Sequence, residues 1–461
     1  MSSATDSPSR RVYFVSLGCP KNQVDTEVML GVARDEGCEL VDDASQADTL
    51  VVNTCGFIDA AKEESIETIL ELAEIKRQSE GAKLVVTGCL SQRYAGQLAT
   101  EMPEVDHFLG SSDMLALRDI VRGSRRRQQV SELDRRAYLY DHAAPRVLVG
   151  QPHRAYIKIA EGCDRPCAFC IIPKLRGPQR SRTVESVVAE ATELVGRGVR
   201  EICLVGQDLT TYGTDLQRRG FAPADFEDLL DGLCGVPGLA WIRLHYAFPT
   251  TTSAGVLDRI ATHPKIASYL DVPLQHVDTE VLRRMRRGYT ERQVQTLVDE
   301  VRSRSPKIWL RTTMLVGHPG ETEAAFRRLA DFIGDGAIDH LGVFPWSREE
   351  GTPSAMLPAR VTEDVAEARA AEIMTIQEEI RRERFRSMIG STMQVMIDGA
   401  SDESEYLLDA RHEGQAPEID GKVVVCDLSA APGEMHAVRI LNASAHDLVA
   451  SADLDRSSLD D

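Results

Sequence analysis

Three cysteines of this chain lie close enough together to bind one inorganic cluster. Cys163, Cys167 and Cys170 form a C-x3-C-x2-C pattern within eight residues. A tight loop brings three sulfurs together at this spacing, with turns supplied by Gly162 and Pro166. Three thiolates can hold three irons of a cubane cluster and leave the fourth iron open. The alternative is a structural zinc site, but the sixteen residues after Cys170 contain no Cys or His that could complete it.

A second set of three cysteines is spread over the first hundred residues. Cys19, Cys55 and Cys89 each follow a short apolar segment, at 12–17, 49–52 and 83–87. If these segments are neighbouring parallel strands, the three sulfurs converge beyond the carboxyl ends of the strands, where such sheets bind ligands. We therefore expect a second three-cysteine cluster with an open iron. Helix N-termini beside these turns are expected to lower the thiol pKa values. The alternative is three buried structural cysteines.

The rest of the chain supplies the elements that would position these sulfurs. Strands and helices alternate over residues 11–120, which predicts a doubly wound parallel sheet. A second alternation contains six βα units and favours a partial barrel, whose active site would lie at the carboxyl ends of its strands. These strands are expected at 155–160, 201–205, 241–246, 268–272, 308–316 and 340–344. Short β-branched runs after residue 388 predict a small antiparallel β-barrel, so the fold class is α/β with a terminal β-barrel.

Five segments follow from this pattern. We expect an N-terminal cluster domain over 10–125, a linker over 126–148 and a central barrel over 149–380. A terminal β-barrel domain is expected over 385–453, with a disordered tail over 454–461. The charged helix expected near 362–387 carries Arg381, Arg382, Arg384 and Arg386, which we interpret as a solvated face rather than a nucleic-acid patch.

Composition and charge restrict the compartment and the partners. The N-terminal segment Met1–Arg11 is polar, and no run of about 18 apolar residues exists, so neither a signal peptide nor a membrane span is expected. Ten cysteines without a secretion signal indicate thiols or metal ligands in a reducing compartment, and we expect a cytoplasmic protein. The net charge of −19 argues against broad affinity for nucleic acid and favours a basic protein partner.

The loop from Glu161 to Cys170, with the aromatic Phe169 before its last cysteine, resembles the radical S-adenosylmethionine (SAM) enzymes. The resemblance implies that the open iron chelates the amino and carboxylate groups of SAM. It also implies that one electron cleaves SAM to methionine and a 5′-deoxyadenosyl radical. Phe169 would then lie beside the adenine; the alternative is a core phenylalanine under the loop.

Polar turns at the expected strand ends are candidate SAM contacts. Gly206 and Gln207 follow the second barrel strand, and Gln275 follows the fourth. Arg243, near the end of the third strand, could hold a SAM carboxylate in a bidentate pair. His276 and His318 fit equally well as hydrogen-bonded polar groups that line the barrel mouth.

The whole arrangement resembles the methylthiotransferase family of radical SAM enzymes, from about residue 11 to 453. These enzymes have an N-terminal cluster domain and a C-terminal TRAM domain. The RimO branch, which methylthiolates an aspartate of small-subunit ribosomal protein twelve, is the most similar. The matching segments are Val15–Glu27, Glu161–Arg182, Val272–Val277 and Ser347–Pro353. The MiaB branch, which modifies isopentenyladenosine in tRNA, typically has Gly-Cys-Gln-Met-Asn where this chain has Gly-Cys-Pro-Lys-Asn. His318 departs from the family, which more often has an aromatic residue there.

The resemblance implies a transferase with two 4Fe-4S clusters that consumes two SAM molecules per turnover, as methyl donor and as radical source. It implies no catalytic residue beyond the cluster ligands. The partners would be ribosomal protein twelve or the ribosomal subunit, and an electron donor of flavodoxin or ferredoxin type. Residues 388–450 carry eleven Asp and Glu against three Lys and Arg, a net charge of −8 that argues against RNA phosphates. The alternatives are the same reaction on tRNA and a non-catalytic iron–sulfur or RNA-binding scaffold.

Overall fold

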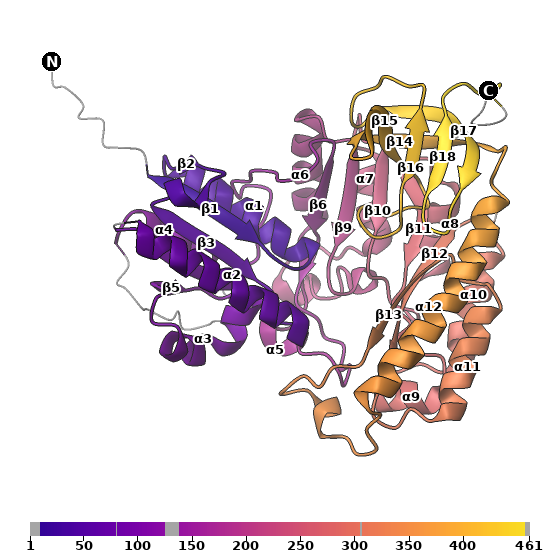
Figure 1. Ribbon diagram of the computed structural model, residues 1–461, viewed down its shortest axis with the longest axis horizontal. Coiled ribbons are helices and arrows are strands. Elements are labelled where there is room, and N and C mark those ends of the chain that lie inside the picture. The colour runs from indigo at the N-terminus through magenta and orange to yellow at the C-terminus, as the bar shows by residue number, and fades with distance from the viewer. Residues whose placement is uncertain (1–9, 80, 125–137, 305–306, 457–461) are drawn as a thin grey trace. The chain divides into compact units, whose positions relative to one another are not determined.

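The computed structural model describes residues 10–79, 81–124, 138–304 and 307–456 (Figure 1). Chain contacts divide it into two compact units. The first contains residues up to Gly150 together with Ala160–Asp164 and Cys170–Arg182. The second contains Gln151–Ile159, Arg165–Phe169 and the chain from Thr183 onward. The expected linker lies largely outside the described residues, as does most of the expected tail, and the domain boundaries stay predictions.

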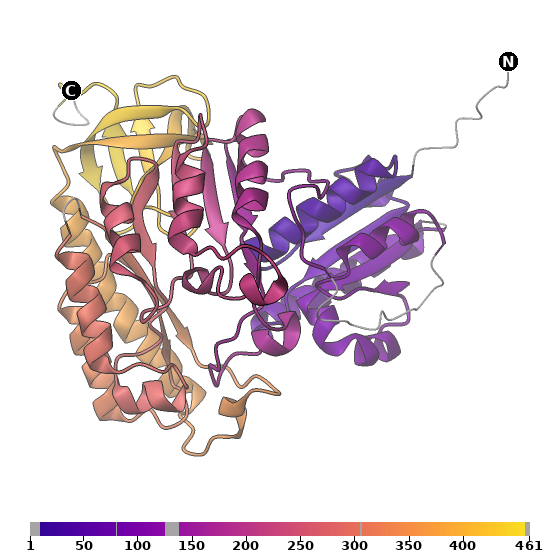
Figure 2. The same ribbon diagram turned by 180° about the vertical axis from the view of Figure 1, so that it is seen from behind.

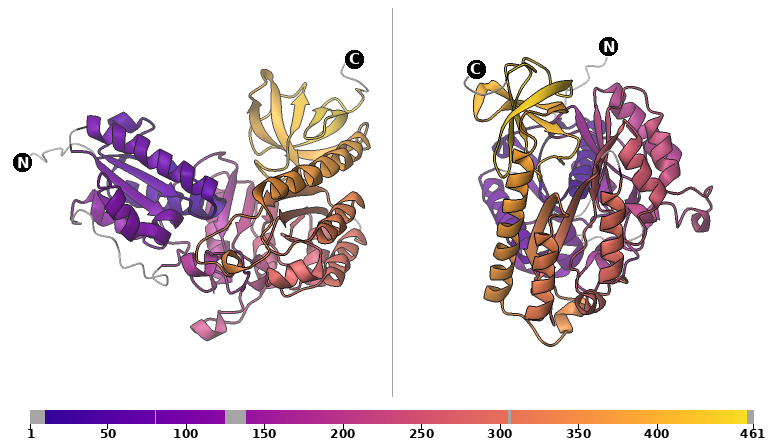
Figure 3. Two further views of the ribbon diagram at one scale, coloured as in Figure 1. Left: turned by 60° about the horizontal axis from the view of Figure 1, so that its bottom comes forward. Right: turned by 90° about the vertical axis from the view of Figure 1, so that its right-hand side faces the viewer.

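The first unit is built on a parallel sheet with the order β2-β1-β3-β4-β5. Its strands are β1 (Arg11–Ser16), β2 (Glu39–Leu40), β3 (Thr49–Thr54), β4 (Lys83–Gly88) and β5 (His107–Phe108). Its helices are α1 (Pro20–Asp35), α2 (Asp59–Gln78), α3 (Cys89–Glu101) and α4 (Leu117–Val121), and they cover both faces of the sheet (Figure 3). β3 is buried at every position, because helices on both sides remove it from water. This is the doubly wound sheet that the sequence predicts.

A short antiparallel ribbon also belongs to the first unit. β7 (Ala160–Glu161) pairs with β8 (Arg180–Ser181), and α5 (Ile172–Arg176) lies between them in sequence. Cys89, Ile171 and Leu175 form a small apolar cluster, with Phe57 packed against it. These contacts join the ribbon segment to α3, and the sequence pattern did not predict the ribbon.

The second unit begins with a six-stranded sheet in the order β13-β12-β11-β10-β9-β6, in which every pair is parallel. Its strands are β6 (Arg154–Lys158), β9 (Glu201–Val205), β10 (Trp241–Leu244), β11 (Ile266–Asp271), β12 (Trp309–Val316) and β13 (His340–Pro345). The helices between them are α6 (Val184–Gly196), α7 (Phe226–Cys234), α8 (Ala254–Thr262), α9 (Thr279–Arg284), α10 (Glu291–Arg302) and α11 (Glu323–Gly334). The six strands expected from the sequence are all present, and the helices lie along one side of the curved sheet (Figure 2).

The long helix α12 (Glu363–Arg386) leads to a closed five-stranded barrel of order β14-β15-β16-β18-β17. Its strands are β14 (Thr392–Ser401), β15 (Ser404–His412), β16 (Val423–Cys426), β17 (Met435–Ala443) and β18 (Leu448–Ser451). One apolar core joins this barrel to the βα sheet, because Trp241, Tyr269 and Trp309 pack among the barrel's buried residues. Among the described residues, no helix is both long and apolar enough to cross a membrane.

Candidate metal centres and cofactor site

The first cysteine set lies at one edge of the first sheet. Cys19 precedes α1 directly after β1, Cys55 follows β3, and Cys89 begins α3 directly after β4. β1, β3 and β4 are neighbours in the sheet, so their carboxyl ends meet at the same edge. The sequence predicted this placement of the three thiols.

Glycine beside these cysteines allows the turns to approach closely. A Cβ atom at Gly18 would lie 2.9 Å from Cys55 Cβ and 3.2 Å from Cys55 Sγ. A Cβ at Gly56 would lie 2.7 Å from the Leu90 backbone, next to Cys89. Gly18 also has a φ of +90°, which side chains rarely adopt. A larger residue at either glycine would therefore push the cysteine turns apart.

Burial favours the neutral thiol at two cysteines of this set. It raises the pKa of Cys55 to about 11 and also raises the pKa of Cys89. For Cys55 and Cys89 the prediction that adjacent helix N-termini lower the thiol pKa is wrong, because loss of solvation outweighs the helix dipole at these depths. If these two thiols bind a metal, bond formation to the metal would have to drive removal of their protons.

A buried arginine contacts this set. Arg176 is 1% exposed, and its Nη2 atom lies 3.6 Å from Cys89 Sγ. The same nitrogen donates to Asn22 Oδ1 at 2.7 Å, and Asn22 Nδ2 donates to the backbone carbonyls of Leu17 and Thr54 at 3.0 Å. Neither residue was singled out from the sequence, although Asn22 lies in the Gly-Cys-Pro-Lys-Asn segment.

Two carboxylates compensate the Arg176 charge. Nη1 lies 2.9 Å from Glu161 Oε1, and Nη2 lies 3.2 Å from Asp25 Oδ2. Glu161 lies two residues before Cys163, the first cysteine of the second set. The Cys163 amide donates to the Gly177 carbonyl at 3.1 Å. Arg176 therefore connects a cysteine of the first set to the strand that enters the second cysteine loop.

The middle of the second loop, Arg165–Phe169, belongs to the second unit and is bonded within it. The Ala168 amide donates to the Met285 carbonyl, and the Ala168 carbonyl accepts from the Ser354 amide, both at 2.8 Å. Arg287 Nη1 lies 3.1 Å from Cys167 Sγ. Cys163, Cys167 and Cys170 are all partly exposed and in no disulfide. The loop is thus fixed by backbone bonds while its thiols stay accessible.

The residues predicted to contact SAM differ in their burial and in their hydrogen bonds. Both amide atoms of Gln207 are buried, and neither has a hydrogen-bond partner within the described chain. An unpaired buried amide is costly, so Gln207 suits a polar ligand. Gln275 has a φ of +69°, and its backbone amide and carbonyl bond to Thr313 and Leu315. Gly206 directly precedes Gln207 at the end of β9, and a Cβ there would meet Leu209 at 3.3 Å.

Phe169 and Arg243 have contacts that bear on their predicted roles. Phe169 packs partly buried against Val281, Met285 and Ala325, as a core phenylalanine under the loop would. Arg243 is fully buried, and its Nε lies 2.7 Å from Glu201 at the start of β9. Its Nη1 donates to the Glu413 carbonyl at 2.7 Å. These two contacts join Arg243 to β9 and to the C-terminal barrel, while its predicted contact with a SAM carboxylate stays a prediction.

The two histidines singled out from the sequence are buried and neutral at pH 7. His276 Nδ1 accepts from the Asp278 amide at 2.9 Å, and His318 Nε2 lies 2.8 Å from Ser354 Oγ. Burial lowers the pKa of His276 to about 3 and that of His318 to about 4. They serve as polar lining, one of the two interpretations that the sequence allows.

The donor chemistry of both cysteine sets fits iron–sulfur clusters. In the described residues, no group of three or more Cys, His, Asp and Glu converges on a single metal ion. A cubane cluster does not require such convergence, because each cysteine ligates a different iron. Three free thiols on closely approaching turns, with an arginine at one sulfur, suit a cluster better than a lone zinc ion.

Three family descriptions match successive parts of the chain. Residues 11–110 match the Uncharacterized protein family UPF0004, residues 157–333 match the Radical SAM superfamily, and residues 389–452 match the TRAM domain. The chain is 48% identical to the ribosomal protein uS12 methylthiotransferase RimO of Sorangium cellulosum, over 96% of this chain and 90% of that protein. It is 46% identical to the protein of the same name from Myxococcus xanthus, over 96% and 91%. It is 45% identical to the protein of the same name from Geobacter sulfurreducens, over 95% of this chain and 98% of that protein.

Solved structures show the same fold at low identity. The radical S-adenosylmethionine methyltransferase TsrM from Kitasatospora setae, with tryptophan and a SAM analogue bound, gives a TM-score of 0.53 at 18% identity, covering 73% of each chain. The same enzyme with cobalamin and a [4Fe-4S] cluster gives 0.51 at 18% identity, covering 76% of this chain and 77% of that chain.

Proposed function

The chain belongs to the RimO family of radical SAM methylthiotransferases, and from this premise we propose that it adds a methylthio group to the β-carbon of an aspartate in ribosomal protein uS12. The observation that carries this proposal is the pair of cysteine sets, each on turns at strand ends. We propose that Cys19, Cys55 and Cys89 hold one 4Fe-4S cluster, and that Cys163, Cys167 and Cys170 hold the other.

The reaction class follows from the bond that must be broken. The β-carbon of the substrate aspartate carries no proton acidic enough for a protein base, so general acid–base catalysis fails. When bound, the second cluster with SAM would supply a radical able to remove this hydrogen, and the first would hold the sulfur species that another SAM methylates. The protein's own residues position these partners: Cys167 is held through Ala168 and Arg287, and Cys89 through Arg176.

Residues at the end of β9 and after β11 are proposed to bind SAM. Gln207 offers a buried amide without a partner in the described chain, and Gly206 leaves room for close approach. Gln275 has its backbone fixed by β12, which leaves its side chain as the available group. Phe169 is partly buried in the loop, and we propose that its exposed part lies beside the adenine.

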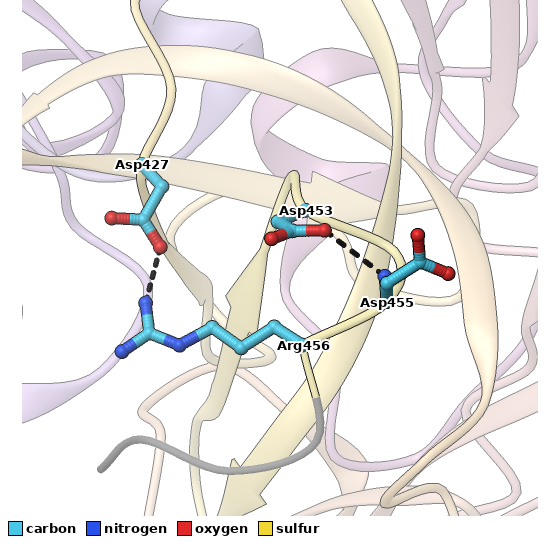
Figure 4. Close-up of a pocket in the computed structure, with 4 residues that line it drawn as sticks. All are labelled: Asp427, Asp453, Asp455 and Arg456. Carbon is cyan, nitrogen blue, oxygen red and sulfur yellow. Dashed lines mark hydrogen bonds and ion pairs between the residues drawn. The ribbon is translucent and has the colours of Figure 1, made fainter. Parts of the chain in front are cut away.

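Charge supports uS12 over tRNA as the substrate. Eleven acidic against three basic residues over 388–450 give the C-terminal barrel a net charge of −8, which repels phosphates and attracts a basic protein. Asp427, Asp453, Asp455 and Arg456 line a surface pocket at this barrel (Figure 4). Arg456 pairs with Asp427, so the acidic excess remains there. We further propose a flavodoxin- or ferredoxin-type electron donor and a cytoplasmic location, in keeping with ten cysteines that form no disulfide.

Cysteine substitution tests the assignment. Cys167→Ala should abolish 5′-deoxyadenosine formation from SAM while the iron of the first set is retained. Cys234→Ser is the matched control, because Cys234 lies at the end of α7 and its sulfur faces His263 at 3.4 Å. Full retention of SAM cleavage in Cys167→Ala would refute the assignment. Absence of deoxyadenosine from the unaltered reconstituted protein would instead indicate a non-catalytic scaffold.

A further inference from the structure

Arg287 is a buried cation that contacts the second cysteine loop. It lies between α9 and α10 and is 8% exposed. Its Nη1 atom is 3.1 Å from Cys167 Sγ. An N–H donor at this distance from a thiolate forms a charge-assisted hydrogen bond.

The remaining contacts hold the Arg287 guanidinium in one orientation. Nε donates to Tyr289 Oη at 2.9 Å, and Nη2 donates to the Pro273 carbonyl at 2.7 Å. Tyr289 Oη donates in turn to the Leu274 carbonyl at 2.7 Å. These contacts hold the guanidinium in one orientation, so Nη1 already points at Cys167 Sγ.

Aromatic packing joins Arg287 to the same loop a second time. The Phe248 ring has the Arg287 guanidinium 4.6 Å from its centre and the Arg165 guanidinium 3.7 Å from it. Arg165 belongs to the cysteine loop and pairs with Asp208 at 2.7 Å. Both guanidinium groups are therefore seated on one ring, which fixes the loop relative to Arg287.

The charge of Arg287 is not cancelled by a carboxylate. Within the described chain it forms no ion pair, and its polar partners are Tyr289, a carbonyl and Cys167. Arg176 at the first set differs, because Asp25 and Glu161 compensate it. An uncompensated buried cation favours the more negative oxidation state of its neighbour, since the local dielectric is low.

We propose that Arg287 is a positioning residue that raises the reduction potential of the cluster held by Cys163, Cys167 and Cys170. The inference rests on the proposed function, which places a cluster at these cysteines. Arg287 stabilises the state that has accepted one electron, so a weaker electron donor suffices to reach it. Its hydrogen bond to the sulfur and its full charge act in the same direction.

The test is a potentiometric titration of a full-length protein whose first site is removed by Cys55→Ala and Cys89→Ala. Dithionite serves as reductant, and electron paramagnetic resonance measures the reduced cluster. In this background Arg287→Met should lower the ratio of reduced to oxidised cluster about tenfold at a fixed potential, which corresponds to a midpoint lower by about 59 mV for a one-electron couple. Arg287→Lys keeps the positive charge but loses the planar set of guanidinium N–H donors, so it should shift the midpoint potential less than Arg287→Met does.

Arg283→Met is the matched control, because Arg283 lies on α9 with its side chain 70% exposed and pairs with Glu280. It should leave the midpoint unchanged. A normal iron content with an unchanged midpoint in Arg287→Met overturns the inference. If Arg287→Met binds no iron, the midpoint potential of Arg287→Lys is measured instead. An unchanged midpoint in Arg287→Lys then overturns the inference. A background protein that binds no cluster at all would refute the proposed function instead.

Discussion

Arg176 Nη2 lies 3.6 Å from Cys89 Sγ, in a site that excludes water from both groups. The guanidinium also bridges Asp25 and Glu161, which come from α1 and β7. A single arginine thus joins a cysteine turn of the first sheet to β7, the strand that precedes the second cysteine loop. This connection is made wholly within the first unit.

Replacement of this arginine should destabilise the first unit. Arg176→Met removes a buried cation that contacts both Asp25 and Glu161, and loss of one partner of a buried pair costs about 3–5 kcal/mol. We expect a lower unfolding midpoint and loss of iron from the first set. Chemical unfolding and iron analysis measure both. Arg77→Met, at a side chain 69% exposed on α2, should change stability by less than about 0.5 kcal/mol. Equal effects of the two substitutions would contradict the role of Arg176.

A second buried arginine holds the C-terminal barrel on the βα sheet. Arg411 Nη2 lies 2.7 Å from Glu201 Oε2, and its Nε lies 2.7 Å from Asp398 Oδ2. Arg411→Met should cost about 3 kcal/mol, because Glu201 then keeps only Arg243 as a cation partner. We expect faster proteolysis between residues 386 and 392 and a separate, earlier thermal transition. A single transition at the unaltered temperature would contradict this account of the interface.

Acid should weaken the same interface through His412. Its ring lies 4.7 Å from that of Trp309, and burial lowers the pKa of His412 to about 3. Because the pKa in the unfolded chain is about 6.5, the neutral ring contributes stability above that pH, and this contribution is lost as pH falls toward 3. The loss is about 1.4 kcal/mol per pH unit, or about 2 kcal/mol between pH 6.5 and 5.

His412→Phe separates this effect from packing. The substitution retains the ring against Trp309 but removes the acceptor of the Gly414 amide bond at 2.9 Å, so it should cost about 1 kcal/mol at pH 8. Urea unfolding at several pH values should then show a smaller loss of stability between pH 6.5 and 5 than in the unaltered protein. His276 and His318, whose pKa values are also lowered, keep part of the dependence. An unchanged slope would contradict the assignment to His412.

Charge reversal on the C-terminal barrel should weaken uS12 binding. Asp402, Glu403 and Glu405 are exposed, and their joint replacement by Lys changes the charge of this barrel by about six units. We expect at least about a tenfold loss of affinity for uS12 at low salt, and a smaller loss at high salt. SAM cleavage without uS12 should be unchanged.

The matched control makes the same change of charge in the first unit. Glu63, Glu64 and Glu67 are exposed on α2, and their replacement by Lys should have little effect on uS12 affinity. Fluorescence anisotropy with labelled uS12 measures both triple variants. If the α2 variant weakens binding as much as the barrel variant, net charge rather than the C-terminal barrel attracts the substrate.

The sequence predicted the parts that depend on local pattern. Apolar runs and turn spacing predict the six strands β6 and β9–β13, and they place cysteines after β1, β3 and β4. The strands β2, β7 and β8 were missed, because two-residue strands carry no periodicity. The sequence shows which side chains are charged, but it does not show which residues far away in the chain the fold places against them.

The arginines show this limit most clearly. Arg381, expected on a solvated face, is 9% exposed and contacts His446. Arg384 donates to Asp339 and to the Gly336 carbonyl. Arg176 and Arg287 gave no signal in the sequence, because the sulfurs they contact are 87 and 120 residues away. The same limit applies to Arg243. The sequence placed Arg243 near the end of a strand, but it did not show that the side chain pairs with Glu201.

The most direct test of the central claim is one anaerobic incubation. The cluster-reconstituted protein is mixed with SAM, reductant, uS12 and tRNA, and both macromolecules are then analysed by mass spectrometry. We predict a gain of one SCH2 unit on an aspartate of uS12 and none on tRNA. The same gain on an adenosine of tRNA would contradict the proposed substrate, and deoxyadenosine without either product would contradict the proposed transfer.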